Sequence, residues 1–212
     1  MKKLLIVAAI SAVSLTSFAQ EEVTSYNLVG VSYDLTSVSA NKDQKPFGLD
    51  GKSSAPLSGF GIEYTHGFGL GSNMFIEGGL KFNMGFKKYS KEKVDLNYSF
   101  SRLSIPVSYA YRFNCGDKLA FTPYAGLDFR FNLTGQSKLS YGDEKETQNW
   151  FKKDDTDPTF KRFQMGWHIG VRAEYSRIFA NVNFGTDFLP AWKYEKYKYS
   201  TLNFTFGLGY RF

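Results

Sequence analysis

The chain has 212 residues, with 26 Lys and Arg against 20 Asp and Glu, and a formal net charge of +6. This length suits one domain, and the basic residues are scattered among aromatic ones, which argues against a nucleic-acid-binding protein. Cys115 is the only cysteine, so the chain has no internal disulfide.

The N-terminal stretch has the features of a secretory signal peptide. Lys2 and Lys3 precede an apolar run, and Ser17-Phe18-Ala19 forms a small-x-small cleavage pattern. The run is too short to span a bilayer, so we expect a cleaved signal at 1–19 and a mature domain at 20–212. No later stretch is long and apolar enough for a transmembrane helix, and membrane insertion would therefore require strands.

Segments with a period of two follow the signal, which predicts strands with different surroundings on their two faces. In chain order the eight segments are about 26–37, 57–66, 73–88, 96–113, 119–134, 162–176, 178–188 and 200–212. In the third segment, for example, Ile76 and Phe82 share one face and Glu77 lies on the other. Pro106 and Pro123 lie inside two segments, where we expect local bulges.

The last segment alternates strictly and ends on an aromatic residue. One face is bulky and apolar, comprising Leu202, Phe204, Phe206, Leu208, Tyr210 and Phe212. A strand of this kind resembles the closing strand of bacterial outer-membrane β-barrels. The resemblance implies that the barrel assembly machinery is a partner and that Phe212, with Tyr210, forms an assembly signal.

The connections between the segments alternate in length. Shorter links occupy 67–72, 114–118 and 176–177, and longer polar stretches occupy 38–56, 89–95, 135–161 and 189–199. This alternation is typical of barrels with short periplasmic turns and long extracellular loops. The sequence therefore predicts an all-β fold, an eight-stranded antiparallel up-and-down transmembrane β-barrel.

The apolar face could point into the barrel, as in a secreted lipocalin-like protein, or out toward lipid. Eight strands enclose an interior only just wide enough for side chains to fill, and the Phe, Tyr, Leu and Trp side chains of this face do not fit there. We therefore expect the apolar face outside and the small polar face inside. In water that exterior would be an unusually large apolar patch, so we predict an integral protein of a Gram-negative outer membrane.

Three stretches carry a family resemblance: RLSIPVSYAYRF (102–113), FTPYAGLDFRF (121–131) and MGWHIGVRAEY (165–175). They resemble the outer-membrane β-barrel domain of PorT type, which is widespread in Bacteroidetes. In size the chain is also similar to the eight-stranded barrels of OmpA and OmpX type. The resemblance implies the fold and the location, and it raises a role in a secretion or transport apparatus.

Charged residues recur on the predicted inward face. The expected lumen charge network comprises Glu63, Glu77, Lys81, Arg102, Arg112, Asp128, Arg130, Arg172, Glu174 and Arg211. Buried charges must pair or be hydrated, so these residues predict either a plug of salt bridges or a narrow water-filled path that favours anions.

The two histidines give no sign of a catalytic or metal centre. His168 faces inward in the middle of its segment, whereas His66 lies near a turn, so we expect the two to be far apart along the barrel. We predict no shared metal site, no cofactor, no Ser-His-Asp arrangement and no enzymatic activity.

The outer loops hold the residues that we expect to meet partners: Trp150, Phe151, Trp192, Tyr194 and Tyr197. These aromatic residues and the neighbouring lysines could form a girdle that meets outer-membrane lipid and lipopolysaccharide. They could instead bind a protein or glycan. We therefore predict a non-enzymatic barrel with a structural or surface-interaction role, with a PorT-like secretion component or a narrow solute pore as alternatives.

Overall fold

The computed structural model describes residues 25–40, 56–91, 94–142, 144–152, 160–189, 191–194 and 197–212. The regular elements of these residues are strands, and no helix among them is long and apolar enough to cross a membrane. The predicted signal at 1–19 lies outside the described residues.

Eleven strands form within the described residues. They are β1 (Ser25–Ala40), β2 (Leu57–Gly71), β3 (Met74–Lys91), β4 (Val94–Tyr111), β5 (Phe113–Asn114), β6 (Leu119–Tyr141), β7 (Glu144–Asn149), β8 (Phe163–Tyr175), β9 (Ile178–Asp187), β10 (Trp192–Tyr194) and β11 (Tyr197–Arg211). The eight long ones correspond to the eight predicted segments, and β5, β7 and β10 are short additions that pair with β6 or β11.

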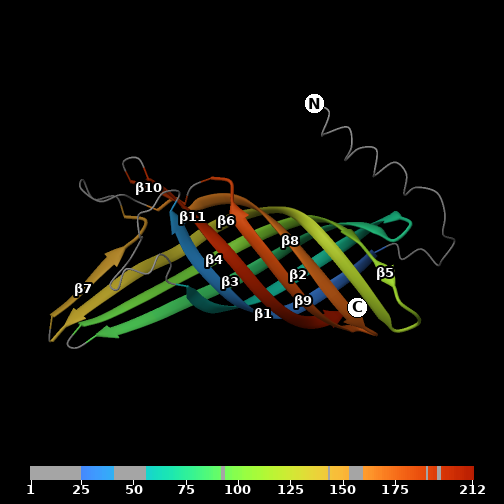
Figure 1. The fold of residues 1–212 in the computed structure, drawn as a ribbon, viewed down its shortest axis with the longest axis horizontal. Helices are drawn as coiled ribbons and strands as arrows, with labels where there is room; N and C mark the ends of the chain where they lie inside the picture. Colours follow the sequence, from blue (N-terminus) through green and yellow to red (C-terminus); the bar gives the residue numbers. More distant parts are fainter. Residues whose placement is uncertain are drawn as a thin grey trace, which may run out of the picture.

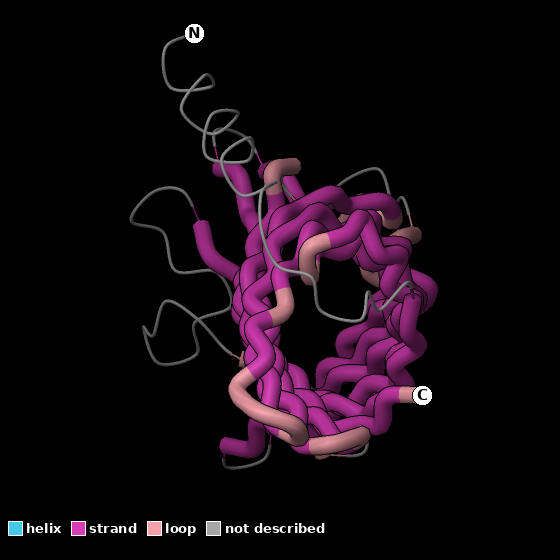
Figure 2. Tube along the Cα trace, turned by 90° about the vertical axis from the view of Figure 1, so that its right-hand side faces the viewer, coloured by secondary structure: helices cyan, strands magenta, loops and turns pink. Residues whose placement is uncertain are grey.

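The long strands form one closed antiparallel ring in the order β1-β2-β3-β4-β6-β8-β9-β11. The ring closes because β11 also pairs with β1, from Leu28 opposite Arg211 to Ala40 opposite Tyr199. Phe212 continues this seam, since its backbone N–H donates to Asn27 O at 3.0 Å and its carbonyl accepts from Asn27 N at 2.9 Å. Figure 2 shows the ring end-on, and the predicted eight-stranded up-and-down barrel is confirmed.

Tight turns gather at one end of the ring, which we call the short-turn end. Ser72 and Asn73 link β2 to β3 with φ values of 51° and 64°, and Ser176, with φ 57°, turns β8 into β9. Positive φ at two successive residues is the geometry that matches the twist of a two-residue hairpin. The C-terminus lies at this end too (Figure 1).

The opposite end, which we call the long-hairpin end, differs from the sequence prediction. The stretches 89–95 and 135–161, expected as long loops, are mostly strand over their described residues: β3 and β4 run to Lys91 and Val94, and β6 runs to Tyr141 and pairs back with β7. Their polar residues occupy both faces, so the alternation fades although the backbone ladder continues. Figure 1 shows β3, β4, β6 and β7 extending beyond the rest of the ring.

The two prolines do not cause the expected bulges. Pro123 pairs with Val171 in an uninterrupted register, and the β3–β4 pairing that lapses beside Pro106 resumes in the same register. The N–H that proline lacks therefore removes at most a few backbone pairings beside it, and the strands keep their register. The register shifts lie elsewhere. One falls between Gly69 and Gly71 in β2, and the other falls opposite Ser101 and Arg102, where Leu133 of β6 has no partner in β4.

The outward face of the ring is apolar, as predicted. Its most exposed side chains include Ile62, Leu208 and Val31, which are 62%, 62% and 61% exposed. Such residues recur along every long strand, so the apolar exterior far exceeds the few hundred Å² found on soluble monomers. This exterior suits contact with lipid.

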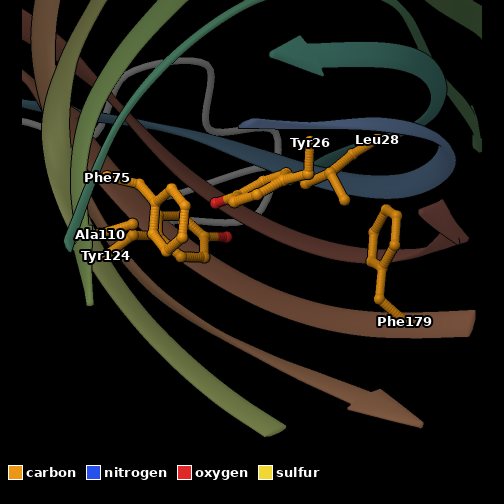
Figure 3. Packing of buried hydrophobic residues seen from close by; sticks show 6 residues of the cluster. All are labelled: Tyr26, Leu28, Phe75, Ala110, Tyr124 and Phe179. Carbon is orange, nitrogen blue, oxygen red and sulfur yellow. The ribbon is translucent and has the colours of Figure 1, made fainter. Parts of the chain in front are cut away.

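The interior is only partly as predicted, because bulky residues join the small polar ones. A buried cluster comprises Tyr26, Leu28, Phe75, Ala110, Tyr124 and Phe179, which project into the barrel from β1, β3, β4, β6 and β9 (Figure 3). Phe75 and Phe179 are each 1% exposed. The apolar core of the protein therefore lies inside the ring near its short-turn end.

Candidate functional site

Arg172 is the centre of the polar network at the short-turn end. It forms an ion pair with Glu77, and its Nε lies 3.3 Å from Glu174 Oε1. The guanidinium also lies 5.6 Å from the Tyr26 ring and 5.9 Å from the Phe179 ring. Two carboxylates neutralise this buried cation while aromatic faces surround it, which meets the requirement that a buried charge be paired.

Glu174 joins two further arginines to the same network. Arg112 Nη1 lies 3.1 Å and Arg211 Nη1 lies 3.6 Å from Glu174 Oε2, and the Glu174 side chain is 1% exposed. Thr122 Oγ1 donates to the other carboxylate oxygen at 3.3 Å. Together with the apolar cluster, this network fills the short-turn end of the lumen.

Asp34 organises a second network, which the sequence analysis missed. Its Oδ1 accepts hydrogen bonds from Lys81 Nζ at 2.7 Å and Thr205 Oγ1 at 2.6 Å, and its Oδ2 accepts from Asn83 Nδ2 at 2.6 Å. Glu63 lies farther from Lys81, at 4.0 Å. The polar residues that alternate in β1, at positions 32, 34 and 36, were the signal for this inward carboxylate.

A third network surrounds Arg130 toward the long-hairpin end. Its Nη1 donates to Asp187 Oδ1 at 2.5 Å, and its Nη2 donates to Asp128 Oδ2 at 2.9 Å. Asp187 also accepts from the backbone and the hydroxyl of Thr201, at 2.7 and 2.6 Å. Arg130 is therefore neutralised by two carboxylates, as Arg172 is.

His168 lies between Ser108 and Asp128, although the sequence analysis expected no such arrangement. The distance from Ser108 Oγ to His168 Nε2 is 2.7 Å, and Nδ1 lies 3.1 Å from Asp128 Oδ1. Nδ1 is not aligned for a hydrogen bond with that carboxylate. The expectation of no Ser-His-Asp arrangement was wrong because the register between β4, β6 and β8, and not position along the chain, brings the three side chains together.

Arg102 differs from the other lumen arginines. The residue is 5% exposed, yet among the described residues its guanidinium forms no ion pair with a carboxylate. Both Nη atoms donate to Asn203 Oδ1 at 3.2 Å, and Nε has no hydrogen-bond partner. Within the described part of the chain, Arg102 is therefore a buried cation that no carboxylate contacts directly.

Two cavities meet at Arg102. One, of about 80 Å³, lies inside the ring and is lined by polar residues that include Asp34, His168 and Arg172. The other, of about 70 Å³, lies at the long-hairpin end. Its lining comprises Thr36, Leu57, Lys87, Tyr89, Tyr98, Phe100, Arg102, Asn132, Trp150, Phe151, Phe160, Gln164 and Thr201.

Aromatic rings form the wall of this second cavity, which we call the mouth pocket. Trp150 lies 6.3 Å from Tyr98 and 5.3 Å from Phe160, measured between ring centroids, and its Nε1–H donates to Ser137 Oγ at 2.6 Å. Burial raises the pKa of the Tyr98 hydroxyl. Trp150 and Phe151 were expected to be exposed in an outer loop, but both are half-buried and line the pocket.

Two glycines make room for these rings. A Cβ at Gly85 would lie 2.1 Å from the Phe100 ring, and a Cβ at Gly135 would lie 2.5 Å from the Trp150 ring. The bulge beside Arg102 also turns Gly135 toward the pocket, since it shifts β6 by one residue relative to β4. Local backbone features therefore shape the mouth pocket.

The remaining predicted residues do not join a common site. Tyr210 and Phe212 are exposed on the outer face at 43% and 58%. The backbones of Trp192, Tyr194 and Tyr197 lie in the β10–β11 hairpin, and their side chains lie outside the described part of the structure.

Residues 5–212 match the family described as outer membrane protein beta-barrel domain. The solved structure of Ail, the attachment invasion locus protein of Yersinia pestis, in complex with the heparin analogue sucrose octasulfate, is similar in fold. It is 12% identical, has a TM-score of 0.51, and the match covers 89% of this chain and 99% of Ail. Neisserial surface protein A is 12% identical with a TM-score of 0.43, over 91% of this chain and 100% of that chain. No curated protein matches. The chain is an outer-membrane barrel and belongs to the outer membrane protein beta-barrel domain family.

Proposed function

We propose that this protein is a non-enzymatic surface-interaction barrel whose long-hairpin end faces the outside of the cell. The observation that carries the proposal is the length of β6, which has 23 residues, whereas about 9–11 span a bilayer. The extra length forms a sheet with β3, β4 and β7 that needs no lipid around it. All six residues of β7 are polar and exposed, which suits contact with water and partners.

The chemistry of this end favours an anionic glycan as the partner. Exposed cations there include Lys88, Lys138, Lys145, Lys161 and Arg162. Lysine and arginine attract sulfate and phosphate groups, so the same residues would meet the phosphates of lipopolysaccharide in the outer leaflet. Because the structure of Ail contains a heparin analogue, a sulfated polysaccharide is the first probe to use.

A pore function is not supported by the lumen. The aromatic residues around Arg172 and the carboxylates that neutralise it occupy the interior at the short-turn end. Ions would have to displace a paired and desolvated network to pass. Purified protein in a planar lipid bilayer should therefore show no single-channel steps.

Hydrolase activity is not supported either, despite the Ser108–His168 contact. The carboxylate that would orient the histidine also binds Arg130, and it is not aligned with Nδ1. The backbone around Ser108 is engaged in the ladders with β3 and β6, so the described residues offer no backbone oxyanion hole there.

The experiment is to remove cations from the β6–β7 hairpin and measure surface binding. Glu144 and Glu146 lie beside Lys138 and Lys145, so deleting the tip would remove more negative than positive charge, and the variant is therefore Lys138→Gln/Lys145→Gln in the full-length hairpin. Cells that display the wild type should retain fluorescent heparin, and cells with Lys138→Gln/Lys145→Gln should retain less of it at equal outer-membrane levels. Asn73→Gly, in a turn at the opposite end, is the matched control and should bind as the wild type does.

Equal heparin binding by Lys138→Gln/Lys145→Gln and the wild type would contradict the proposal. The PorT-type resemblance implies a different outcome: a secretion component would lose protein export when the tip is deleted by joining the paired residues Ser137 and Gln148 through an Asn-Gly turn. Measuring secreted protein in the same strains separates the two roles.

A further inference from the structure

Arg102 lies at the floor of the mouth pocket, and no carboxylate of the described residues contacts its buried positive charge. Removal from water is costly for a guanidinium unless a counter-ion and hydrogen-bond acceptors replace the water. Arg130 and Arg172 each contact two carboxylates, whereas Arg102 shares one neutral amide oxygen of Asn203 between its two Nη atoms. The Nε–H remains available, and Nε with one Nη is the edge of the guanidinium that a carboxylate binds bidentately.

The surroundings of this cation define what kind of anion could reach it. Above Arg102 the pocket is walled by the rings of Tyr98, Phe100, Trp150 and Phe160, and Phe100 also contacts the guanidinium at 5.7 Å. A strongly hydrated inorganic ion would lose water on the side of these rings, and the rings offer it no hydrogen-bond donors in return. A planar apolar group bearing one acidic group would stack against the rings and also neutralise the charge of the arginine.

We propose that the mouth pocket binds a small aromatic carboxylate, with its ring against Trp150 and Tyr98 and its carboxylate on Arg102. The pocket, of about 70 Å³, is too small for an oligosaccharide, and a single ring would fill it and reach out through its open side at the mouth of the barrel. Lys87, whose Nζ lies 5.4 Å from the Tyr89 ring, adds a second positive charge at the entrance. The site is distinct from the exposed cations of the hairpins, so it goes beyond the proposed glycan binding and does not depend on it.

Binding can be measured through Trp150. In a Trp167→Phe/Trp192→Phe background Trp150 is the only tryptophan, because the chain has three. The protein is placed in lipid nanodiscs, since detergent could occupy the pocket, and titrated with 4-nitrobenzoate, which quenches tryptophan. The quenching should saturate, and 4-nitrobenzamide, which has the same shape without the charge, should bind about tenfold or more weakly, the factor for one charge-assisted hydrogen bond.

Two substitutions test the role of Arg102 by opposite means. Arg102→Gln removes the cation, and Asn203→Asp places a carboxylate beside it at the present 3.2 Å contact, which supplies the missing counter-ion from within the protein. Both should weaken 4-nitrobenzoate binding about tenfold or more. Lys88→Gln is the matched control, because Lys88 is exposed in the same hairpin as Lys87, and its affinity should equal that of the wild type.

Heat-modifiable migration on a detergent gel establishes that each variant is folded. If Arg102→Gln does not fold, Asn203→Asp decides the question alone, since it preserves the side-chain shape and pairs the arginine. The proposal is overturned if quenching does not saturate, if a folded Asn203→Asp binds as tightly as the wild type, or if the neutral amide binds as tightly as the carboxylate. Full displacement of 4-nitrobenzoate by equimolar sulfate would also overturn it, because the aromatic wall would then contribute nothing.

Discussion

Glu77→Gln tests whether the buried ion network stabilises the barrel. Glu77 is 4% exposed, and its Oε1 accepts hydrogen bonds from Arg172 and the Tyr26 hydroxyl. The substitution keeps the shape and removes the charge, which leaves Arg172 with Glu174 as its remaining carboxylate at 3.3 Å. Breaking a buried pair costs about 3–5 kcal/mol. Because Glu174 still compensates part of the charge, we expect the lower end, about 3 kcal/mol, or roughly a 150-fold change in the unfolding equilibrium.

The double variant Glu77→Gln/Arg172→Met separates pairing from packing. Removing both partners leaves no unpaired arginine, and Glu174 keeps its contacts with Arg112 and Arg211, so the double variant should recover most of the loss. The assay is equilibrium urea unfolding in lipid vesicles, followed by tryptophan fluorescence. Lys88→Gln is the control, because it breaks an exposed pair with Asp95 worth about 0–1 kcal/mol. If Glu77→Gln costs no more than this control, the reasoning about the network is refuted.

Three further predictions concern the seam, the mouth pocket and the hairpin tip. Deleting Phe212 removes the terminal aromatic and its two hydrogen bonds with Asn27, so outer-membrane levels on immunoblots should fall, and unchanged levels would contradict the assembly-signal prediction. Gly135→Ala should destabilise the barrel in urea by about 1–3 kcal/mol, because its Cβ would overlap the Trp150 ring, whereas Gly78→Ala, with open space, should be neutral. Hydrogen bonds from Ser90 and Lys88 hold the pKa of the Asp95 carboxyl below its usual value. Any stability that these hydrogen bonds add is therefore present at pH values above the ordinary aspartate pKa. It is lost as the pH falls through the lowered pKa of Asp95. An NMR titration should show the Asp95 pKa rise in Lys88→Gln, and no rise would contradict this.

The outer wall could be predicted from the sequence because alternation survives wherever one face meets lipid and the other the lumen. Segments such as 200–212 alternate without a break, and the structure places their bulky residues outside. The extended hairpins could not be predicted in this way. Beyond the bilayer β6 no longer separates lipid from the lumen, so residues 135–141 lose the period of two although they remain paired.

The contents of the lumen were less accessible to sequence reasoning. Phe75 and Phe179 each lie between two apolar neighbours, so alternation does not reveal that they point inward. Partners such as Ser108 and His168, or Arg102 and Asn203, come from different strands, and a shift of one residue would separate them. Register, which a single sequence does not specify, decides which lumen charges are paired.

Cysteine labelling on intact cells tests the central claim, that the long-hairpin end faces outward, most directly. Cys115 is exposed in the turn between β5 and β6, and Gly142 is exposed at the tip between β6 and β7. A maleimide linked to a polymer too large for porins should label Cys115→Ser/Gly142→Cys in intact cells and the wild type only after the outer membrane is permeabilised. Labelling of the wild type in intact cells, with the Gly142→Cys variant protected, would contradict the account.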